Sequence, residues 1–67
     1  MLNRSVMKQK MQDKGISQYA LADAVGVAQP MIAQILVGRR QPSLGLAASI
    51  AKVLGCTLDE LVEYEAI

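Results

Sequence analysis

The side chains in this chain that could do chemistry are amides and cations rather than nucleophiles, general bases or metal ligands. The 67 residues contain no histidine and one cysteine, Cys56, so neither an ordinary metal site nor an internal disulfide is expected. We find no paired-carboxylate pocket and no glycine-rich phosphate loop, and therefore expect no catalytic residues and no cofactor. Helix capping and the helix dipole explain the adjacent carboxylates Asp59 and Glu60. The composition favours a binding protein over an enzyme.

The charges are few but unevenly distributed. The net charge is only +1, yet five of the seven basic residues form two patches. One patch contains Arg4, Lys8 and Lys10, and the other contains Arg39 and Arg40. Four of the six acidic residues fall within the last nine positions. Such polarity orients a protein on an anionic surface with its acidic end directed away.

Helices must position these side chains, because the apolar residues recur at helical spacing. Hydrophobic residues make up 52 % of the chain and are nearly all aliphatic, which suits close helix packing. We predict five helices and no strand, at residues 3–14, 18–25, 29–36, 44–54 and 58–64. Capping residues such as Ser17, Ser43 and Thr57 precede these segments, and glycines follow them. The predicted fold is all-α: one compact five-helix domain over residues 1–67.

The location of the protein is also predicted from the pattern of apolar residues. No apolar run approaches the length of a membrane span, and the N-terminus lacks the apolar core of a signal peptide. We therefore expect a cytoplasmic protein that does not contact a membrane. A domain of this size buries little surface on folding, so dimerisation would add stability.

The most informative stretch is residues 18–37, where a tight turn joins two short predicted helices. Steeply crossing helices require a small residue such as Ala22 where the second helix passes over the first. The turn requires a left-handed backbone, which suits Gly26, and an apolar plug between the helices, which suits Val27. The positions that set this packing are Leu21, Ala22, Gly26, Val27, Ile32 and Ile35.

All these positions fit together in QYALADAVGVAQPMIAQILV, which closely resembles the helix-turn-helix of the lambda repressor/Cro-like (XRE-type) family. The resemblance continues to about residue 62 and covers about residues 5–62. It implies a lambda-repressor-like fold with the helix-turn-helix at about residues 18–37. The implied function is that of a sequence-specific regulator of transcription, of the phage or plasmid repressor or Cro type. Such a regulator binds a palindromic operator in double-stranded DNA as a homodimer.

The resemblance places the third helix in the major groove, with its first residues facing base edges. Gln29 is then the best candidate for reading a base, because its amide can donate and accept at once and so bond adenine N7 and N6. Gln34 lies on the same outward face, and the apolar Ala33 and Met31 are candidates for contact with a thymine methyl. Alternatively, these four residues are only exposed positions opposite the core.

The resemblance also implies contacts with the DNA backbone. Gln18 begins the second helix, where free N–H groups and the helix dipole favour a phosphate. Arg39, Arg40 and Gln41 lie in the loop after the reading helix, and Ser43 starts the next helix. Each could instead be a solvated surface residue, but two arginines beside the reading helix favour phosphate contact.

Three features depart from the family pattern. Ala28 stands where many relatives have a Ser or Thr that caps the third helix. Met11 and Leu36 stand where some phage repressors bury an Arg–Glu pair, and we interpret them as an apolar substitute. Pro30 and Met31 stand where relatives often have polar readers, so the operator cannot be inferred by analogy.

Residues 57–67 are the predicted dimer contact. Leu58, Leu61 and Val62 are expected to close the core, and Tyr64 and Ile67 then lie near a chain end with little left to cover them. We predict that Leu58, Tyr64 and Ile67 contribute to the dimer contact. Pairing there would place two reading helices about 34 Å apart, whereas the alternative is a frayed tail. An antitoxin or adaptor on the same fold is the alternative function, although almost nothing follows Val62 to wrap a protein partner. We expect no small-molecule ligand. The sequence leaves two alternatives open, a full-length regulator and a fragment of a longer one.

Overall fold

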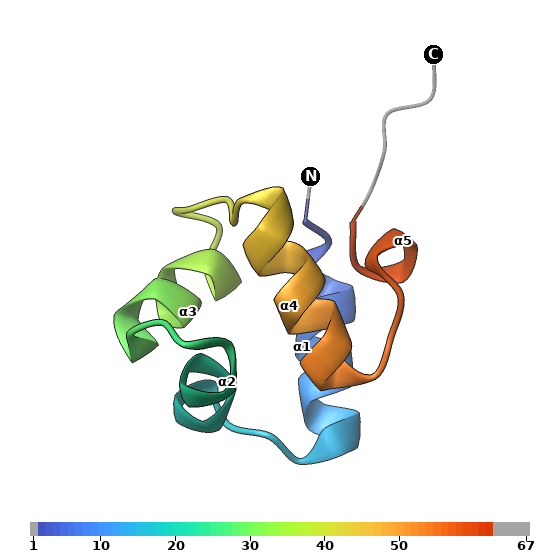
Figure 1. The fold of residues 1–67 in the computed structure, drawn as a ribbon, viewed down its shortest axis with the longest axis horizontal. Helices are drawn as coiled ribbons and strands as arrows, with labels where there is room; N and C mark the ends of the chain where they lie inside the picture. Colours follow the sequence, from blue (N-terminus) through green and yellow to red (C-terminus); the bar gives the residue numbers. More distant parts are fainter. Residues whose placement is uncertain (1, 63–67) are drawn as a thin grey trace.

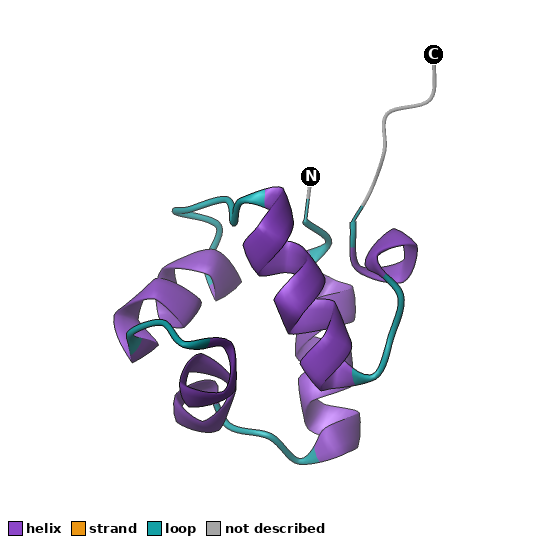
Figure 2. Ribbon diagram, in the orientation of Figure 1, coloured by secondary structure: helices purple, strands orange, loops and turns teal. Residues whose placement is uncertain are grey.

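The computed structural model describes residues 2–62, and this part of the chain forms five helices and no strand (Figures 1 and 2). The helices are α1 (Arg4–Lys14), α2 (Gln18–Val25), α3 (Gln29–Leu36), α4 (Leu44–Leu54) and α5 (Leu58–Leu61). In the view of Figure 1, α4 crosses in front of α1, with α2 and α3 on one side and α5 on the other. The predicted all-α class is confirmed.

Side-chain caps begin four of the five helices, because each cap satisfies a backbone N–H that has no partner in the first turn. The capping residues are Asn3, Ser17, Ser43 and Thr57. The Thr57 hydroxyl accepts the Glu60 N–H at 3.2 Å and donates to the Glu60 carboxylate at 3.3 Å, so both the main chain and the side chain of Glu60 bond this cap. Asn3 is thus a cap, and α1 begins one residue later than predicted.

One apolar core joins the five helices. The largest fully buried side chains are Met7, Leu21, Ile32, Ile35, Ile50, Leu54 and Leu61. Every helix contributes at least one of them, and such packing is the main source of stability for helices this short. Within residues 2–62 no polar or charged side chain is buried.

The prediction that the last helix extends to residue 64 is wrong. Val62 has an extended backbone (φ −112°, ψ 131°), and it forms an isolated antiparallel bridge with Leu2. The Asn3 N–H donates to the Leu61 carbonyl at 2.8 Å, so the segment before α1 pairs with the end of α5. Pairing between the two segments replaces the next helical turn, and residues 63–67 lie outside the described part of the chain.

No helix between residues 2 and 62 is both long enough and apolar enough to span a membrane. Only α2 and α3 taken together reach that length and hydropathy, and a bend of 117° separates them.

Candidate nucleic-acid interface

The turn between α2 and α3 sets the angle at which the two helices meet. Gly26 ends α2 in the left-handed conformation (φ 77°), and the Val27 N–H returns to the Ala22 carbonyl at 3.0 Å. The axes of α2 and α3 differ by 117°, within the range of helix-turn-helix motifs. Of the residues expected to set this packing, Leu21, Ala22, Ile32 and Ile35 are buried and Val27 is half-buried against the core. The crossing brings the N-terminal ends of the two helices together.

Gln18 and Gln29, the first residues of α2 and α3, form a hydrogen bond at that crossing. Gln29 Nε2 donates to Gln18 Oε1 at 2.9 Å, and the bond is partly buried. It uses one hydrogen of Gln29 Nε2, so the second hydrogen and Oε1 can still make a bidentate contact. The Gln18 Nε2 group keeps two donors for a different acceptor. One bond thus orients two amides whose remaining groups suit a base and a phosphate.

The start of α3 does without a capping side chain, as the sequence suggested. Ala28 is the N-cap residue and offers no side-chain oxygen. Pro30 has no N–H, so the first turn of α3 has one fewer backbone donor to satisfy. The Met31 N–H donates to the Ala28 carbonyl at 3.0 Å, which satisfies the next donor without a capping side chain.

The outer face of α3 carries part of the predicted reading set. Gln34 is exposed, and Gln29 and Ala33 are half-buried. Met31 is half-buried and packs against the hydrophobic core, so part of its side chain is turned away from any partner. Val37, which the sequence did not single out, is 61 % exposed just after the helix. The sequence could have indicated Val37 by its spacing, because a residue three positions after Gln34 lies on the same helical face.

The loop from α3 to α4 presents both of its arginines. Arg39 and Arg40 are exposed, which leaves their guanidinium groups accessible. Gln41 Oε1 accepts the Leu2 N–H at 3.3 Å, so this predicted phosphate ligand also holds the N-terminal segment. The Ser43 hydroxyl accepts the Leu46 N–H at 3.2 Å, and its own hydrogen is left to donate elsewhere. Of these four predicted phosphate contacts, the two arginines are the ones whose side chains form no hydrogen bond or ion pair within residues 2–62.

The basic residues of α1 have separate positions. A Cβ at position 38 would lie 2.6 Å from Arg4 Nη1, so the Arg4 guanidinium lies over Gly38 at the end of α3. Cations are favourable at a helix C-terminus, where the dipole is negative. Lys10 instead pairs with Glu60 of α5 at 3.4 Å. Arg4 and Lys8, four residues apart on α1, were not among the predicted site residues, although that spacing places both on one helical face.

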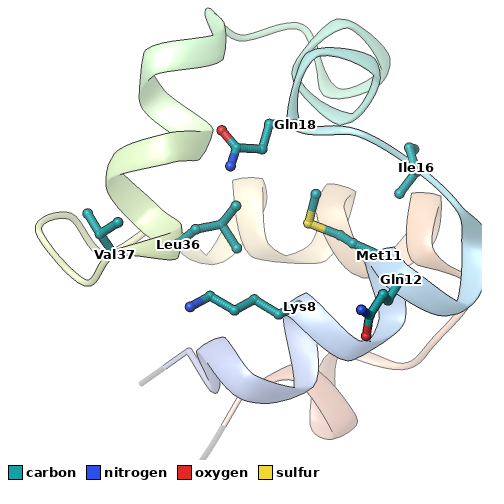
Figure 3. Close-up of a pocket in the computed structure, with 7 residues that line it drawn as sticks. All are labelled: Lys8, Met11, Gln12, Ile16, Gln18, Leu36 and Val37. Atoms are coloured by element: carbon teal, nitrogen blue, oxygen red, sulfur yellow. The ribbon is translucent and has the colours of Figure 1, made fainter.

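An open groove separates α1 from α2 and α3 (Figure 3). It has a volume of about 580 Å³ and is named here the α1–α3 groove. Its lining residues are Lys8, Met11, Gln12, Ile16, Gln18, Leu36 and Val37. Figure 3 shows Met11 and Leu36 reaching into it from opposite sides and Gln18 directing its amide inward. Met11 and Leu36 are both buried, so the floor of the groove is apolar. That they replace a charged pair stays a prediction.

A second, smaller groove of about 230 Å³ lies beside the start of α4. This α4 groove is lined by Leu2, Gln41, Pro42, Leu44, Ala47 and Val62. Leu44 is 68 % exposed, a high value for a leucine, whereas the predicted dimer residue Leu58 is half-buried. The other two predicted dimer residues, Tyr64 and Ile67, lie outside the described part of the chain.

Known proteins share this arrangement. The helix-turn-helix family profile matches residues 7–61. An uncharacterised HTH-type transcriptional regulator of Methanothermobacter thermautotrophicus is 38 % identical over 52 residues, which cover 78 % of this chain and 75 % of that protein. A crystal structure of an HTH_3 family transcriptional regulator from Vibrio cholerae matches 85 % of this chain at 26 % identity with a TM-score of 0.75. The match covers 32 % of the Vibrio chain, so this chain spans about a third of its length. The protein belongs to the lambda repressor/Cro-like helix-turn-helix family.

Proposed function

We propose that this protein is a transcriptional regulator that binds a specific double-stranded DNA sequence through α2 and α3. The observation that carries the proposal is the Gln18–Gln29 hydrogen bond, which holds two amides at adjoining helix N-termini. Helix N-termini favour phosphates, and glutamine amides read adenine in the major groove. The matched proteins from Methanothermobacter and Vibrio are both described as transcriptional regulators, which supports the same role here.

In this proposal α3 lies in the major groove. Gln29 reads an adenine near the start of the helix, Gln34 reads a second base pair, and Ala33 touches a thymine methyl. Met31 contributes less contact with the DNA than these three residues, because its side chain is half-buried against the core.

The DNA backbone is held on both sides of the reading helix. Gln18 binds one phosphate, and Arg39 and Arg40 bind others from the loop that follows α3. Gln41 and Ser43 extend this contact, and Arg4 and Lys8 of α1 add charge beside it. Because phosphate contacts release counterions, affinity falls steeply as salt rises.

The regulator acts as a homodimer on a palindromic operator, in the manner of phage Cro proteins and repressors, and excludes other proteins from a promoter. The exposed Leu44 and the α4 groove give a second copy an apolar surface beside the predicted C-terminal contact. A two-fold axis there would join equal surfaces and place two α3 helices on one side of the DNA.

Selection of sites from random duplex DNA tests the proposal. We expect an enriched palindrome whose half-site centres are about 10 base pairs apart. Gln29→Ala should lose discrimination at one base pair in each half-site, whereas Arg39→Ala should weaken all sequences and reduce the salt slope by about 1. Gln9→Ala is the matched control, because that exposed amide bonds Asp13 at 2.9 Å within α1. Failure to enrich any sequence would refute the proposal and favour a protein-binding role such as an antitoxin or adaptor.

A further inference from the structure

The α1–α3 groove combines an apolar floor with a polar rim. Met11 and Leu36, both buried, form the floor. The polar side chains that line the groove carry one ammonium and two amides, those of Lys8, Gln12 and Gln18. Small-molecule sites in proteins have volumes of about 300–1,000 Å³. The groove, with about 580 Å³, has the size of such a site. The sequence did not indicate it, because its walls come together only after folding.

The charge of the groove favours an anion. Lys8 is exposed and forms no ion pair within residues 2–62, and none of the acidic residues in that range lines the groove. Figure 3 shows Lys8 extending along the α1 side of the groove and Gln18 directing its amide inward from the α2 side. Because Gln18 Oε1 already accepts the bond from Gln29, the group left for a ligand is the donor Nε2. An ammonium and an amide N–H in one groove suit the oxygens of a carboxylate or a phosphate.

The apolar walls distinguish a free ligand from DNA. Ile16 is half-buried and Val37 is 61 % exposed, so both retain apolar surface inside or beside the groove. A DNA phosphate can engage the polar rim, but it has no hydrocarbon to cover these walls. A small amphipathic anion, with a carboxylate at one end and a hydrocarbon chain at the other, matches both parts. Burial of the chain would supply most of the affinity, since an exposed ion pair contributes little.

We propose that the α1–α3 groove is an effector site, which binds a small amphipathic carboxylate and thereby releases DNA. The carboxylate accepts a hydrogen bond from Gln18 Nε2 and lies near the Lys8 ammonium, while the chain lies against Ile16, Leu36 and Val37. The Gln18 donors are the ones proposed for a DNA phosphate, so either anion excludes the other. Binding to the groove does not depend on the proposed function, and only the release of DNA rests on it.

Octanoate is the probe for binding, and methionine methyl groups are the reporters. The protein is isotope-labelled at its methionine methyls and titrated with octanoate by NMR in the absence of DNA. We expect the Met11 signal to shift saturably with a dissociation constant on the order of 1 mM, because an open groove covers only part of a small ligand. The Met7 signal should shift far less, since that side chain is fully buried. Inorganic phosphate and octanol each have half of the required chemistry and should leave Met11 nearly unchanged.

Variants at the rim assign the contacts. Lys8→Gln should weaken octanoate binding about two- to fivefold, the contribution of an exposed ion pair. Lys52→Gln is the matched control, because it removes the same charge from an exposed position of α4 outside the groove. Val37→Asp should weaken binding more than Val37→Asn, since it adds a like charge at the edge of the groove. Circular dichroism checks that these exposed substitutions keep the fold. The proposed site is overturned if Met11 does not shift, if phosphate or octanol shifts it as strongly, or if Lys8→Gln and Val37→Asp both bind octanoate as wild type does.

The release of DNA is measured on an operator obtained by selection. At ten times its own dissociation constant, a competitor weakens binding about tenfold, so octanoate should raise the operator dissociation constant by at least that factor. Acetate at the same concentration keeps the ionic strength equal and should have no such effect. If octanoate shifts Met11 but leaves operator affinity unchanged, the effector role is overturned. If no operator is enriched, the proposed function fails, whereas the titration without DNA still decides whether the groove binds the anion.

Discussion

Removing the Gln18 amide is expected to weaken base reading by Gln29, even though the proposed partner of Gln18 is a phosphate of the DNA backbone. Gln18 Oε1 accepts a hydrogen bond from Gln29 Nε2 at a nitrogen-to-oxygen distance of 2.9 Å, and a neutral bond of this kind contributes about 0.5–1.5 kcal/mol. A bidentate amide–adenine contact discriminates between bases by about 1–3 kcal/mol. Gln29→Ala should therefore weaken cognate binding by about 5-fold to 150-fold. Gln18→Ala should weaken all sequences and also reduce discrimination at the adenine that Gln29 reads.

A double-mutant cycle measures this coupling. Wild type, Gln18→Ala, Gln29→Ala and the double variant are titrated against the operator and against an operator changed at that adenine, at one salt concentration. We expect a coupling of about 0.5–1.5 kcal/mol, the contribution of the bond that aligns the reading amide. Gln9→Ala should leave both affinities unchanged. If the two losses add within about 0.3 kcal/mol, the bond does not organise the reading and the reasoning is refuted.

Three further changes test the fold and the dimer. Ser17→Ala should lower the free energy of unfolding by about 1 kcal/mol in urea titrations, because its hydroxyl accepts the Ala20 N–H. Ala28→Ser should raise the free energy of unfolding by up to about 1 kcal/mol, because a hydroxyl there can accept the Met31 N–H, the third after the cap; unchanged stability in both variants would contradict this account. Gly38→Ala should cost about 1–2 kcal/mol through its positive φ of 81°. The flexible Arg4 side chain can move aside, so the same cost is expected in an Arg4→Ala background, and a much smaller one there would show that the clash dominates. Leu44→Ser should shift the proposed dimer towards monomer in sedimentation experiments with no loss of helicity. An unchanged sedimentation profile would contradict the proposal that the α4 groove lies in the dimer interface.

The parts of the fold that were predictable depend on residues close together in sequence. Ser17 and Gly26 delimit α2 because a cap needs only the next three residues and a left-handed turn needs only one glycine. The apolar spacing of Ile32 and Ile35 likewise gives the inward face of α3. Local rules were sufficient for the order of the helices, and for most of their ends.

The features that were missed depend on segments that meet only after folding. The end of α5 is set by Leu2, which pairs with Val62 and stops the helix. Lys10 was grouped with other basic residues, but Glu60 of α5 engages it. The Gln18–Gln29 bond could not be predicted, although both residues could, because it requires the angle between α2 and α3. The angle between two helices cannot be derived from the spacing of residues within each helix.

The pairing of the first described residues with the end of α5 bears on how the protein is made. The Asn3 N–H and Leu2 find their partners at Leu61 and Val62, almost the whole described chain away. During synthesis, the segment that holds α1 in register must wait until those last partners have left the ribosome. The early helices can form local turns before then, but the closing contact cannot. A nascent chain stalled before Leu61 would thus display α2 and α3 on an unfinished core, and the surface proposed to bind DNA would become rigid only after Leu61 and Val62 have emerged.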